Sequence, residues 1–354
     1  TIYFFYEMLS VSTFPLVTHM QDKQARTGGR TYLGYLLFTS LCLLLPALSW
    51  CYVWLDGGNM TMDFMADVGK VGHFGETTQI VLLFLFTFGF AKAGLMPAHS
   101  WLPGAMVAPT PVSALLHAVA VVKVGVFCVY RVYADVFGPE VLAKMGGEEW
   151  AMVIASATII ISSLIALSQD NLKRRLAFST IGQLGYIVLG AAIATDRGQG
   201  GAVLHIAMHA CGKITLFFCA GAIFVASGKK YVSELRGIGR KMPLTMGAFM
   251  IGSLSVIGLP PFGGFISKWY LALGALDRDA MWVVVVLLIS SLLNVFYLLP
   301  VAVTAFFRTP ETEKDSSLKE APWPCVVPLL LTALGCFLLF FWSDTLLQMV
   351  GLQP

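Results

Sequence analysis

Residues 92 to 126 read KAGLMPAHSWLPGAMVAPTPVSALLHAVAVVKVGV, an apolar stretch with a lysine near each end and several prolines between. Pro97 and Pro103 interrupt any helix here, because proline lacks a backbone N–H and its ring clashes with the preceding turn. Lys92 lies five residues before Pro97. In a membrane, unpaired backbone and a charged side chain both need protein or water beside them. The stretch therefore predicts a broken membrane helix that carries buried lysines.

The composition of the whole chain agrees with a membrane protein. Of 354 residues, 57% are hydrophobic and only 12% are charged, and the mean hydropathy is +0.77. Apolar stretches of about 20 residues, long enough to cross a bilayer as helices, recur throughout. We predict about ten spans, at residues 1–18, 31–55, 76–97, 111–134, 149–168, 176–195, 200–226, 242–274, 281–307 and 326–350.

The start of the chain and its cysteines set two further expectations. The sequence opens on TIYFFYEMLS, already inside an apolar run, so we expect a true start further upstream. The seven cysteines are Cys42, Cys51, Cys128, Cys211, Cys219, Cys325 and Cys336. None forms a C-x-x-C pair, which argues against a zinc site, an iron–sulfur cluster or a disulfide framework. No cofactor and no metal are expected in this chain, and any electrons would be carried by another subunit.

Basic residues outside the spans are unevenly divided between the two sides of the predicted bundle. One side holds fourteen: Lys23, Arg26, Arg30, Lys173, Arg174, Arg175, Lys229, Lys230, Arg236, Arg240, Lys241, Arg308, Lys314 and Lys319. The other holds five: Lys70, Arg131, Lys144, Arg197 and Arg278. Because cytoplasmic loops carry the excess of Lys and Arg, the first side should be cytoplasmic and the C-terminus outside. The net charge of +3 is then a topology signal, and nucleic acid is not an expected partner.

Five titratable residues fall inside predicted spans: Glu7, Lys92, Lys123, Lys213 and Lys268. Each charge at the centre of a membrane helix costs about 2.5 to 3.5 kcal/mol, so five cost roughly 10 kcal/mol or more. A lysine near a helix end can instead extend to the headgroups, which is the plain alternative for Lys268. Ionisable groups inside a membrane otherwise mark ion pathways, so we predict that these residues move ions.

A second set of helix breakers, GLPPFGG at residues 258 to 264, precedes Lys268 in the span at 242–274. Single proline kinks are common in membrane helices and mean little alone. Two discontinuous helices in the two halves of a transporter, however, indicate its ion site and an internal repeat. Each break here has a lysine close by, which strengthens that interpretation.

His205, His209 and Lys213 follow one another at intervals of four residues, so on a helix they share one face over about 12 Å. Histidine exchanges protons near neutral pH, and a lysine in apolar surroundings can do so as well, so a proton could pass along this ladder. Two such histidines can also share a zinc ion. No Glu follows His205 as in H-E-x-x-H, and no third ligand is apparent, so the ladder is the preferred interpretation.

With these motifs the sequence resembles the antiporter-like, proton-translocating proteins shared by respiratory complex I, membrane-bound hydrogenases and Mrp-type Na⁺/H⁺ antiporters. Among the Mrp proteins it is similar to the D-type component. The stretch at 92–126 is similar to the family signature. Three other stretches are similar to the family's cytoplasmic turn, its histidine and lysine helix and its second broken helix: DNLKRRLAFSTIGQLGY at 170–186, HIAMHACGKITLFFCAG at 205–221 and GLPPFGGFISKW at 258–269.

The resemblance implies an all-α membrane fold built on two inverted five-helix repeats, each with a half-channel, joined by a polar axis at mid-membrane. This chain would lack the first helices of that fold. Residues 1–148 would form the remainder of the first repeat, helices five to eight of the family fold. Residues 149–322 would form the second repeat, and 323–354 the final helix.

The resemblance also implies a role for each candidate site residue. The fifth-helix glutamate is Glu7, its broken-helix partner Lys92, the connecting lysine Lys123, the central ladder His205, His209 and Lys213, and the terminal acid or lysine Lys268. As a hypothesis, a charge pair between Glu7 and Lys92 forms and breaks. Lys92 then exchanges a proton with Lys123, and the proton continues through Lys213 to Lys268.

Two departures from the family pattern affect the choice of branch. Where many members read WLPDAH, this chain reads WLPGAM, with Gly104 and Met106, which favours the hydrogenase or Mrp branch. The chain also ends soon after its last span, without the long lateral helix of the largest members. A mid-sized subunit is the better match.

The predicted function is translocation of protons, or exchange of Na⁺ for H⁺, by a non-redox pump subunit of a multisubunit redox-driven complex. The alternative is a subunit of a gradient-driven Mrp-type Na⁺/H⁺ antiporter. A transporter of organic solutes is disfavoured, because no substrate motif is apparent. Expected partners are other integral membrane subunits, peripheral iron–sulfur or nickel–iron redox subunits and the lipid bilayer. The expected location is a prokaryotic cytoplasmic membrane.

Overall fold

The computed structural model describes residues 2–55, 70–309 and 319–352, and this part of the chain is almost entirely helical. Apart from one isolated bridge between Asn171 and Tyr231, these residues form no β-structure. The predicted all-α membrane fold is confirmed.

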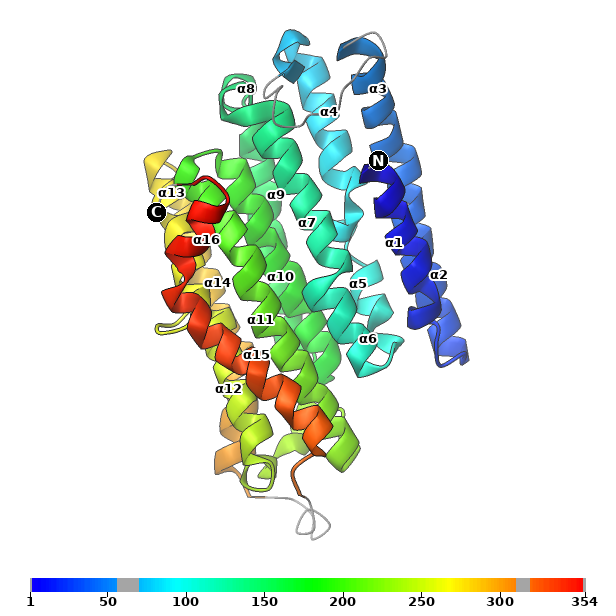
Figure 1. Cartoon of the computed structure of the whole chain (residues 1–354), viewed down its shortest axis with the longest axis vertical. Helices are drawn as coiled ribbons and strands as arrows, with labels where there is room; N and C mark the ends of the chain where they lie inside the picture. The colour runs from blue at the N-terminus through cyan, green and yellow to red at the C-terminus, as the bar shows by residue number, and fades with distance from the viewer. Residues whose placement is uncertain (1, 56–69, 310–318, 353–354) are drawn as a thin grey trace.

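The helices of the first half are short and often irregular, and those of the second half are longer. The first half contains α1 (Ile2–Val17), α2 (Lys23–Thr39), η1 (Ser40–Leu44), α3 (Leu45–Leu55), η2 (Lys70–His73), α4 (Glu76–Gly89), η3 (Ala91–Ala93), α5 (Trp101–Gly104), η4 (Ala105–Val107), α6 (Thr110–Ala114), η5 (Leu115–Val119), α7 (Val121–Arg131), η6 (Val132–Phe137) and α8 (Gly138–Met145). The second half contains α9 (Gly147–Ser168), α10 (Leu172–Ile193), α11 (Asp196–Ser227), η7 (Val232–Leu235), η8 (Ile238–Arg240), α12 (Pro243–Ile257), α13 (Gly263–Asp277), α14 (Met281–Phe307), α15 (Trp323–Phe341) and α16 (Ser343–Met349). In Figure 1, α1 and α2 form one edge of the bundle and α15 crosses in front of α11 obliquely.

Seven helical segments of the described residues are long and apolar enough to cross a membrane. They are Lys23–Trp54, Thr110–Met145, Glu149–Ser168, Leu172–Ile193, Asp196–Ser227, Met281–Phe307 and Trp323–Phe341. Three shorter apolar helices, α1, α4 and α12, occupy the remaining predicted spans. The boundaries differ most at the end of the chain, where the span expected at 326–350 divides into α15 and α16.

Both predicted helix breaks are present. α4 ends at Gly89, a single 3-10 turn carries Lys92, and α-helix resumes only at Trp101. In the second half, α12 ends at Ile257 and α13 begins at Gly263. Gly94 and Gly258 follow the interrupted segments with φ angles of +70° and +89°, which glycine adopts without steric cost.

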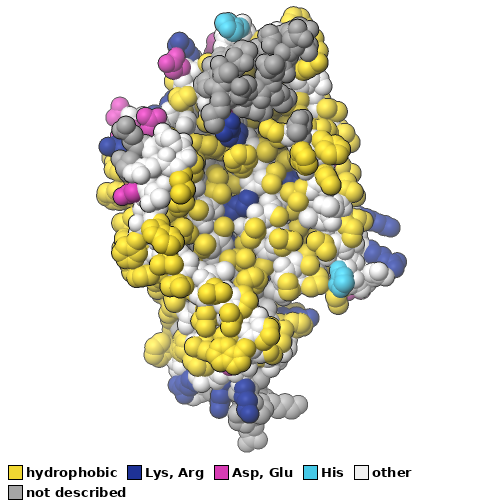
Figure 2. Space-filling view, viewed as in Figure 1, with side chains coloured by type: hydrophobic (Ala, Val, Ile, Leu, Met, Phe, Trp, Pro, Cys, Tyr) yellow, Lys and Arg dark blue, Asp and Glu magenta, His cyan; other side chains and the backbone are white. Residues whose placement is uncertain are grey.

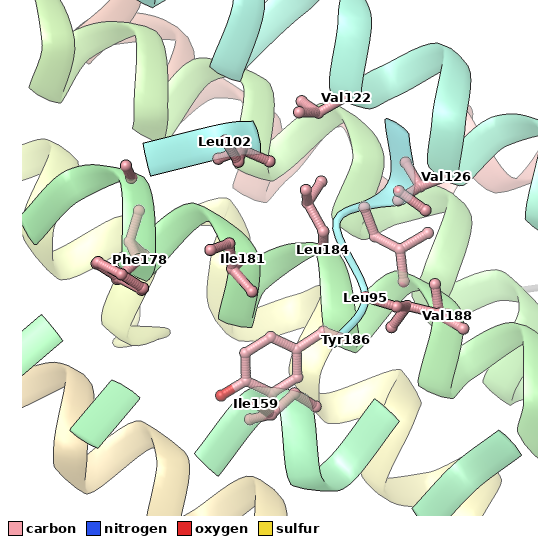
Figure 3. Close-up of a cluster of buried hydrophobic side chains, with 14 of the residues drawn as sticks. Leu95, Leu102, Val122, Val126, Ile159, Phe178, Ile181, Leu184, Tyr186 and Val188 are labelled. Carbon is pink, nitrogen blue, oxygen red and sulfur yellow. The ribbon is translucent and has the colours of Figure 1, made fainter. Parts of the chain in front are cut away.

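α10 forms the centre of the bundle, and the hydrophobic window of this helix is buried on all sides. Figure 3 shows side chains of α10, among them Phe178, Ile181, Leu184 and Val188, packed with Leu95, Leu102, Val122, Val126 and Ile159 from neighbouring segments. Gly182 and Gly185 let α9 approach closely: a Cβ at Gly185 would lie 2.7 Å from a side-chain carbon of Ile159. Small residues at such contacts are typical of packed membrane helices.

The two ends of the bundle differ in charge, as the sequence predicted. One groove of about 1150 Å³ joins the turn at Asp22 to Lys173, Arg174, Lys229 and Lys230, so loops far apart in sequence meet at the same end. Figure 2 shows Lys and Arg side chains at the lower end and the lower right edge, beyond a broad hydrophobic band. Among the fourteen basic residues assigned to this end, Lys314 lies outside the described residues. At the other end Arg197 pairs with Asp277 at 3.0 Å.

Candidate functional site

Lys92 is fully buried at the first break, and its ammonium turns toward α1. Its Nζ atom donates a hydrogen bond to the carbonyl oxygen of Tyr6 and lies 3.1 Å from the centroid of the Tyr6 ring. The Lys92 backbone N–H donates to the Tyr6 hydroxyl at 3.3 Å. Gly125 on α7 permits this close packing, because a Cβ there would overlap the backbone of Lys92 and Ala93. The ammonium is thus held by a carbonyl dipole and an aromatic face.

Glu7 lies next to Tyr6 on α1, and both of its carboxylate oxygens are buried without a hydrogen-bond partner among the described residues. Within this part of the chain, no ion pair of 4.0 Å or less joins Glu7 to Lys92. The expected charge pair is therefore not formed in this structure, because the Lys92 ammonium is directed to Tyr6.

Lys123 on α7 meets the second half of the protein directly. Its Nζ atom lies 2.6 Å from Nδ1 of His209 on α11, and both residues are buried. η3 packs against α7 two residues beyond Lys123, at Gly125, so the break that carries Lys92 is adjacent to this contact. The lysine predicted to connect the two halves of the site does touch the predicted histidine ladder.

His205 continues from His209 along α11. The two rings are stacked with centroids 6.2 Å apart. His205 Nδ1 lies 2.8 Å from Ser267 Oγ and its Nε2 lies 3.1 Å from Gln183 Oε1. Because Ser267 precedes Lys268 on α13, the histidines lead from Lys123 toward the second break.

Lys213 does not continue this ladder. The side chain is fully buried and donates from Nζ to Ser179 Oγ and, at 3.5 Å, to the Leu176 carbonyl, both on α10. No hydrogen bond between Lys213 and either ladder histidine occurs within the described part of the chain. The three residues keep their predicted spacing on α11, and the Lys213 ammonium turns toward α10 because hydroxyl and carbonyl acceptors are offered there.

Lys268 lies at the second break and points inward rather than to the headgroups. It is 8% exposed, which excludes the extended conformation considered as an alternative. Nζ donates at 2.8 Å to the carbonyl of Ile257, the last residue of α12, and at 3.1 Å to Ser291 Oγ on α14. The break thus leaves a helix-terminal carbonyl free, and the lysine satisfies it.

Sequence reasoning missed the neutral polar residues around these groups. Those that contact a predicted site residue are Tyr6, Ser179, Gln183, Tyr186, Ser267 and Ser291, and next to them lie Ser290, Asn294 and Tyr297. Some of these residues could have been recognised from the sequence, because Asn294 and the serine pair at 290–291 interrupt an otherwise apolar span. A search restricted to charged residues and histidine does not find them.

The arrangement suits proton transfer within a membrane interior. A hydrogen bond joins nitrogens of α7 and α11, and the two histidine rings of α11 stack with centroids 6.2 Å apart. Separate hydrogen bonds lead from His205 to α13 and from Lys213, through Ser179 on α10, to α14. Buried ionisable groups in such an arrangement can exchange protons over short distances without contact with bulk water. In the described residues, no group of three or more His, Cys, Asp or Glu could hold a metal ion.

Fold and site together define a polytopic membrane protein with two discontinuous helices and buried lysines around them. Residues 1–294 match the family described as NADH:quinone oxidoreductase/Mrp antiporter, transmembrane part. The chain belongs to this family of antiporter-like ion-translocating subunits.

Individual relatives come from more than one branch. The chain is 33% identical to NADH-quinone oxidoreductase subunit N of Desulforudis audaxviator, covering 99% of this chain and 71% of that protein. It is 30% identical to hydrogenase-4 component B of Escherichia coli, covering 94% of this chain and 52% of that protein. A chain in the Mrp complex of Dietzia sp. shares the fold with a TM-score of 0.86 at 23% identity, covering 99% of this chain and 72% of that one.

Proposed function

We propose that this chain translocates protons across a membrane as the pump subunit of a multisubunit redox-driven complex of the complex I or membrane-bound hydrogenase type. The observation that carries the proposal is the 2.6 Å contact between Lys123 and His209, which links the half of the molecule around the first break to the half around the second. Sequence identity to subunits of two redox enzymes supports the redox-driven setting.

In the proposed mechanism the proton moves between Lys92 and Lys123, passes to His209 and His205, and reaches Lys268 beside Ser267. Glu7 assists by favouring a positive charge on Lys92 when the two approach, and it releases that charge when they separate. Electrons are carried by iron–sulfur or nickel–iron partner subunits, since the chain itself is proposed to bind no cofactor. Other membrane subunits pack beside it.

The proposed orientation places the basic end of the bundle in the cytoplasm and the C-terminus outside, in a prokaryotic cytoplasmic membrane. The support is the excess of Lys and Arg at that end, which follows the rule for cytoplasmic loops. The division into repeats at 1–148 and 149–322 stays a prediction.

A gradient-driven Mrp-type Na⁺/H⁺ antiporter is the second candidate. The carboxylate oxygens of Glu7, which have no hydrogen-bond partner among the described residues, favour it, because hard cations such as Na⁺ take oxygen ligands. In this case Glu7 would bind the exchanged cation, and the partners would be membrane subunits alone.

Purification of the chain from gently solubilised native membranes, with mass spectrometry of all that accompanies it, separates the two candidates. Co-purified iron–sulfur or nickel–iron subunits support the redox-driven pump, and small membrane subunits alone support the antiporter. The purified complex is then reconstituted into proteoliposomes. Electron transfer without acidification of either compartment would reject the pump.

A further inference from the structure

Lys213, which the proposed route from Lys123 to Lys268 does not use, ends a chain of hydrogen bonds that crosses from α11 to α14. Lys213 Nζ donates to Ser179 Oγ, Ser179 Oγ lies 2.7 Å from the Tyr297 hydroxyl, and this hydroxyl donates to Asn294 Oδ1. Each of the four residues is at most 1% exposed. This series of hydrogen bonds is therefore isolated from lipid and solvent. The direction of each bond in it depends on the residues at its two ends, Lys213 and Asn294.

The direction of the hydrogen bonds follows from the Asn294 end. The amide oxygen can only accept, so the Tyr297 hydrogen points to it and the Tyr297 oxygen is left to accept from Ser179. Ser179 has then used its own hydrogen, and its oxygen accepts from Lys213. This arrangement accommodates Lys213 as an ammonium, which can only donate.

Reversal of the Asn294 amide reverses the whole chain. A rotation of about 180° presents the NH₂ group instead of the oxygen at the same place. The amide then donates to Tyr297, Tyr297 donates to Ser179, and Ser179 donates to Lys213, whose nitrogen must accept and is therefore a neutral amine. The contact between Ser179 and Tyr297 fits both states, because either hydroxyl can be its donor.

The surroundings of Asn294 provide a reason for both orientations to be populated. Its Nδ2 atom is buried and has no hydrogen-bond partner among the described residues, so the present orientation leaves one donor unsatisfied. The Tyr186 hydroxyl, which donates to Ser290 Oγ at 2.7 Å, lies beside Asn294 and could donate to the amide oxygen after the rotation. Each orientation thus satisfies some hydrogen bonds and gives up others.

Neutral groups, and not nearby carboxylates, determine the protonation state of Lys213. The titratable or charged residues around Lys213 and its chain are Lys123, Lys268, His205, His209, His117 and Arg175. None of these is a carboxylate. The ammonium is therefore held by the Ser179 hydroxyl and the Leu176 carbonyl, and the direction of the hydroxyl matters.

We propose that Asn294 is a positioning residue whose amide orientation, transmitted through Tyr297 and Ser179, selects between the ammonium and amine forms of Lys213. The inference rests on the proposed function and adds Lys213 to it as a side station that takes up and releases the proton beside the histidine route. Release from Lys213 would accompany rotation of the amide. The proton would pass to Nε2 of His209, which precedes Lys213 by one turn of α11 and has no hydrogen-bond partner among the described residues. The hydrogens of Ser179, Tyr297 and the Asn294 amide would turn together.

The test measures proton transport by the reconstituted complex over about pH 6 to 9. Asn294→Asp offers only acceptors when ionised, so it should lock the ammonium form and move the alkaline limb of the profile up by about one pH unit. Tyr297→Phe removes the hydroxyl that connects Asn294 to Ser179. Adding Asn294→Asp to the Tyr297→Phe variant should therefore shift the alkaline limb little further. Ser179→Ala removes the acceptor next to Lys213 and should move the limb down, which provides a second variant if an Asn294 variant does not assemble.

Tyr133→Phe is the matched control, because Tyr133 is an equally buried tyrosine whose hydroxyl contacts Thr87 at 2.9 Å, remote from Lys213. Its profile should match that of the unaltered complex. An Asn294→Asp shift of the same size with and without Tyr297→Phe would show a plain charge effect and overturn the inference, as would the absence of any shift. If the unaltered complex moves no protons, the proposed function fails and the inference fails with it.

Discussion

Lys123 Nζ and His209 Nδ1 lie 2.6 Å apart although 86 positions separate the two residues in the sequence. The contact joins α7, which packs against the first break, to α11, which packs against the second. Every proton that crosses between the two halves by the proposed route passes this pair. Several predictions about transport can therefore be tied to individual atoms.

The first concerns Lys92, which is fully buried against Tyr6. Lys92→Ala should lower transport by roughly 100-fold, the scale of a lost proton-transfer group, while the complex still assembles. The measurement is proton flux into proteoliposomes, with the amount of assembled complex determined in parallel. Lys23→Ala is the control, since Lys23 is exposed at the basic end. Normal flux in the Lys92 variant would contradict the mechanism.

The second concerns the Lys123–His209 pair itself. Lys123→Met and His209→Leu should each reduce transport strongly, and the double variant should be little worse than either, because both remove the same link. Residues in direct contact typically show coupling of about 0.5 to 3 kcal/mol in such cycles. Flux is measured for all four proteins, and losses that simply add would indicate that the two residues act separately.

The third concerns Glu7, whose carboxylate oxygens are buried without partners among the described residues. Glu7→Gln keeps the size of the side chain and removes its charge, so transport should fall while thermal stability in detergent changes little. A rise in stability would be consistent with relief of a buried unpaired charge. If Na⁺ is the carried ion, the loss should appear in Na⁺-dependent flux, so flux is measured with and without Na⁺. Unchanged flux in both conditions would remove Glu7 from the mechanism.

The fourth concerns the packing of the second break. A Cβ at Gly264 would overlap the Ser255 carbonyl, so Gly264→Ala should destabilise the protein by about 1 to 3 kcal/mol. Gly247→Ala in α12 is the matched control, because a Cβ there meets nothing within 4 Å. Thermal unfolding of the detergent-solubilised complex gives the comparison. Equal stability of the two variants would show that the break is looser than the structure indicates.

Much of the fold could be predicted because a bilayer restricts what a sequence can form. Apolar runs of sufficient length must be helices, and the breakers around Pro97 and at 258–264 indicate where two of them are interrupted. Single prolines do not carry this signal, because Pro15, Pro300 and Pro328 lie inside helices. The buried lysines could also be located, since a charge inside an apolar span is conspicuous. What each lysine touches could not be predicted, because that depends on contacts between distant segments.

Lys213 illustrates this limit. Helical spacing correctly places it four residues after His209, but spacing says nothing about the hydroxyl of Ser179, 34 positions away, that takes its hydrogen bond. Lys92 is similar: the family resemblance implies a carboxylate partner at Glu7, and the structure directs the Lys92 ammonium to the carbonyl of Tyr6, the residue before Glu7. A neutral acceptor leaves no charge pattern in the sequence.

The burial of the hydrophobic window of α10 has a consequence for the speed of rearrangements at the site. Because the hydrophobic window of α10 is packed on every side, we expect this part of the helix to stay in place. Lys213, Lys268 and the histidines are arranged around it. Rotations of single side chains around this helix take picoseconds to nanoseconds when free and longer when packed. We therefore expect the rate of proton transfer to depend on the rotation of individual side chains, and not on large movements of helices.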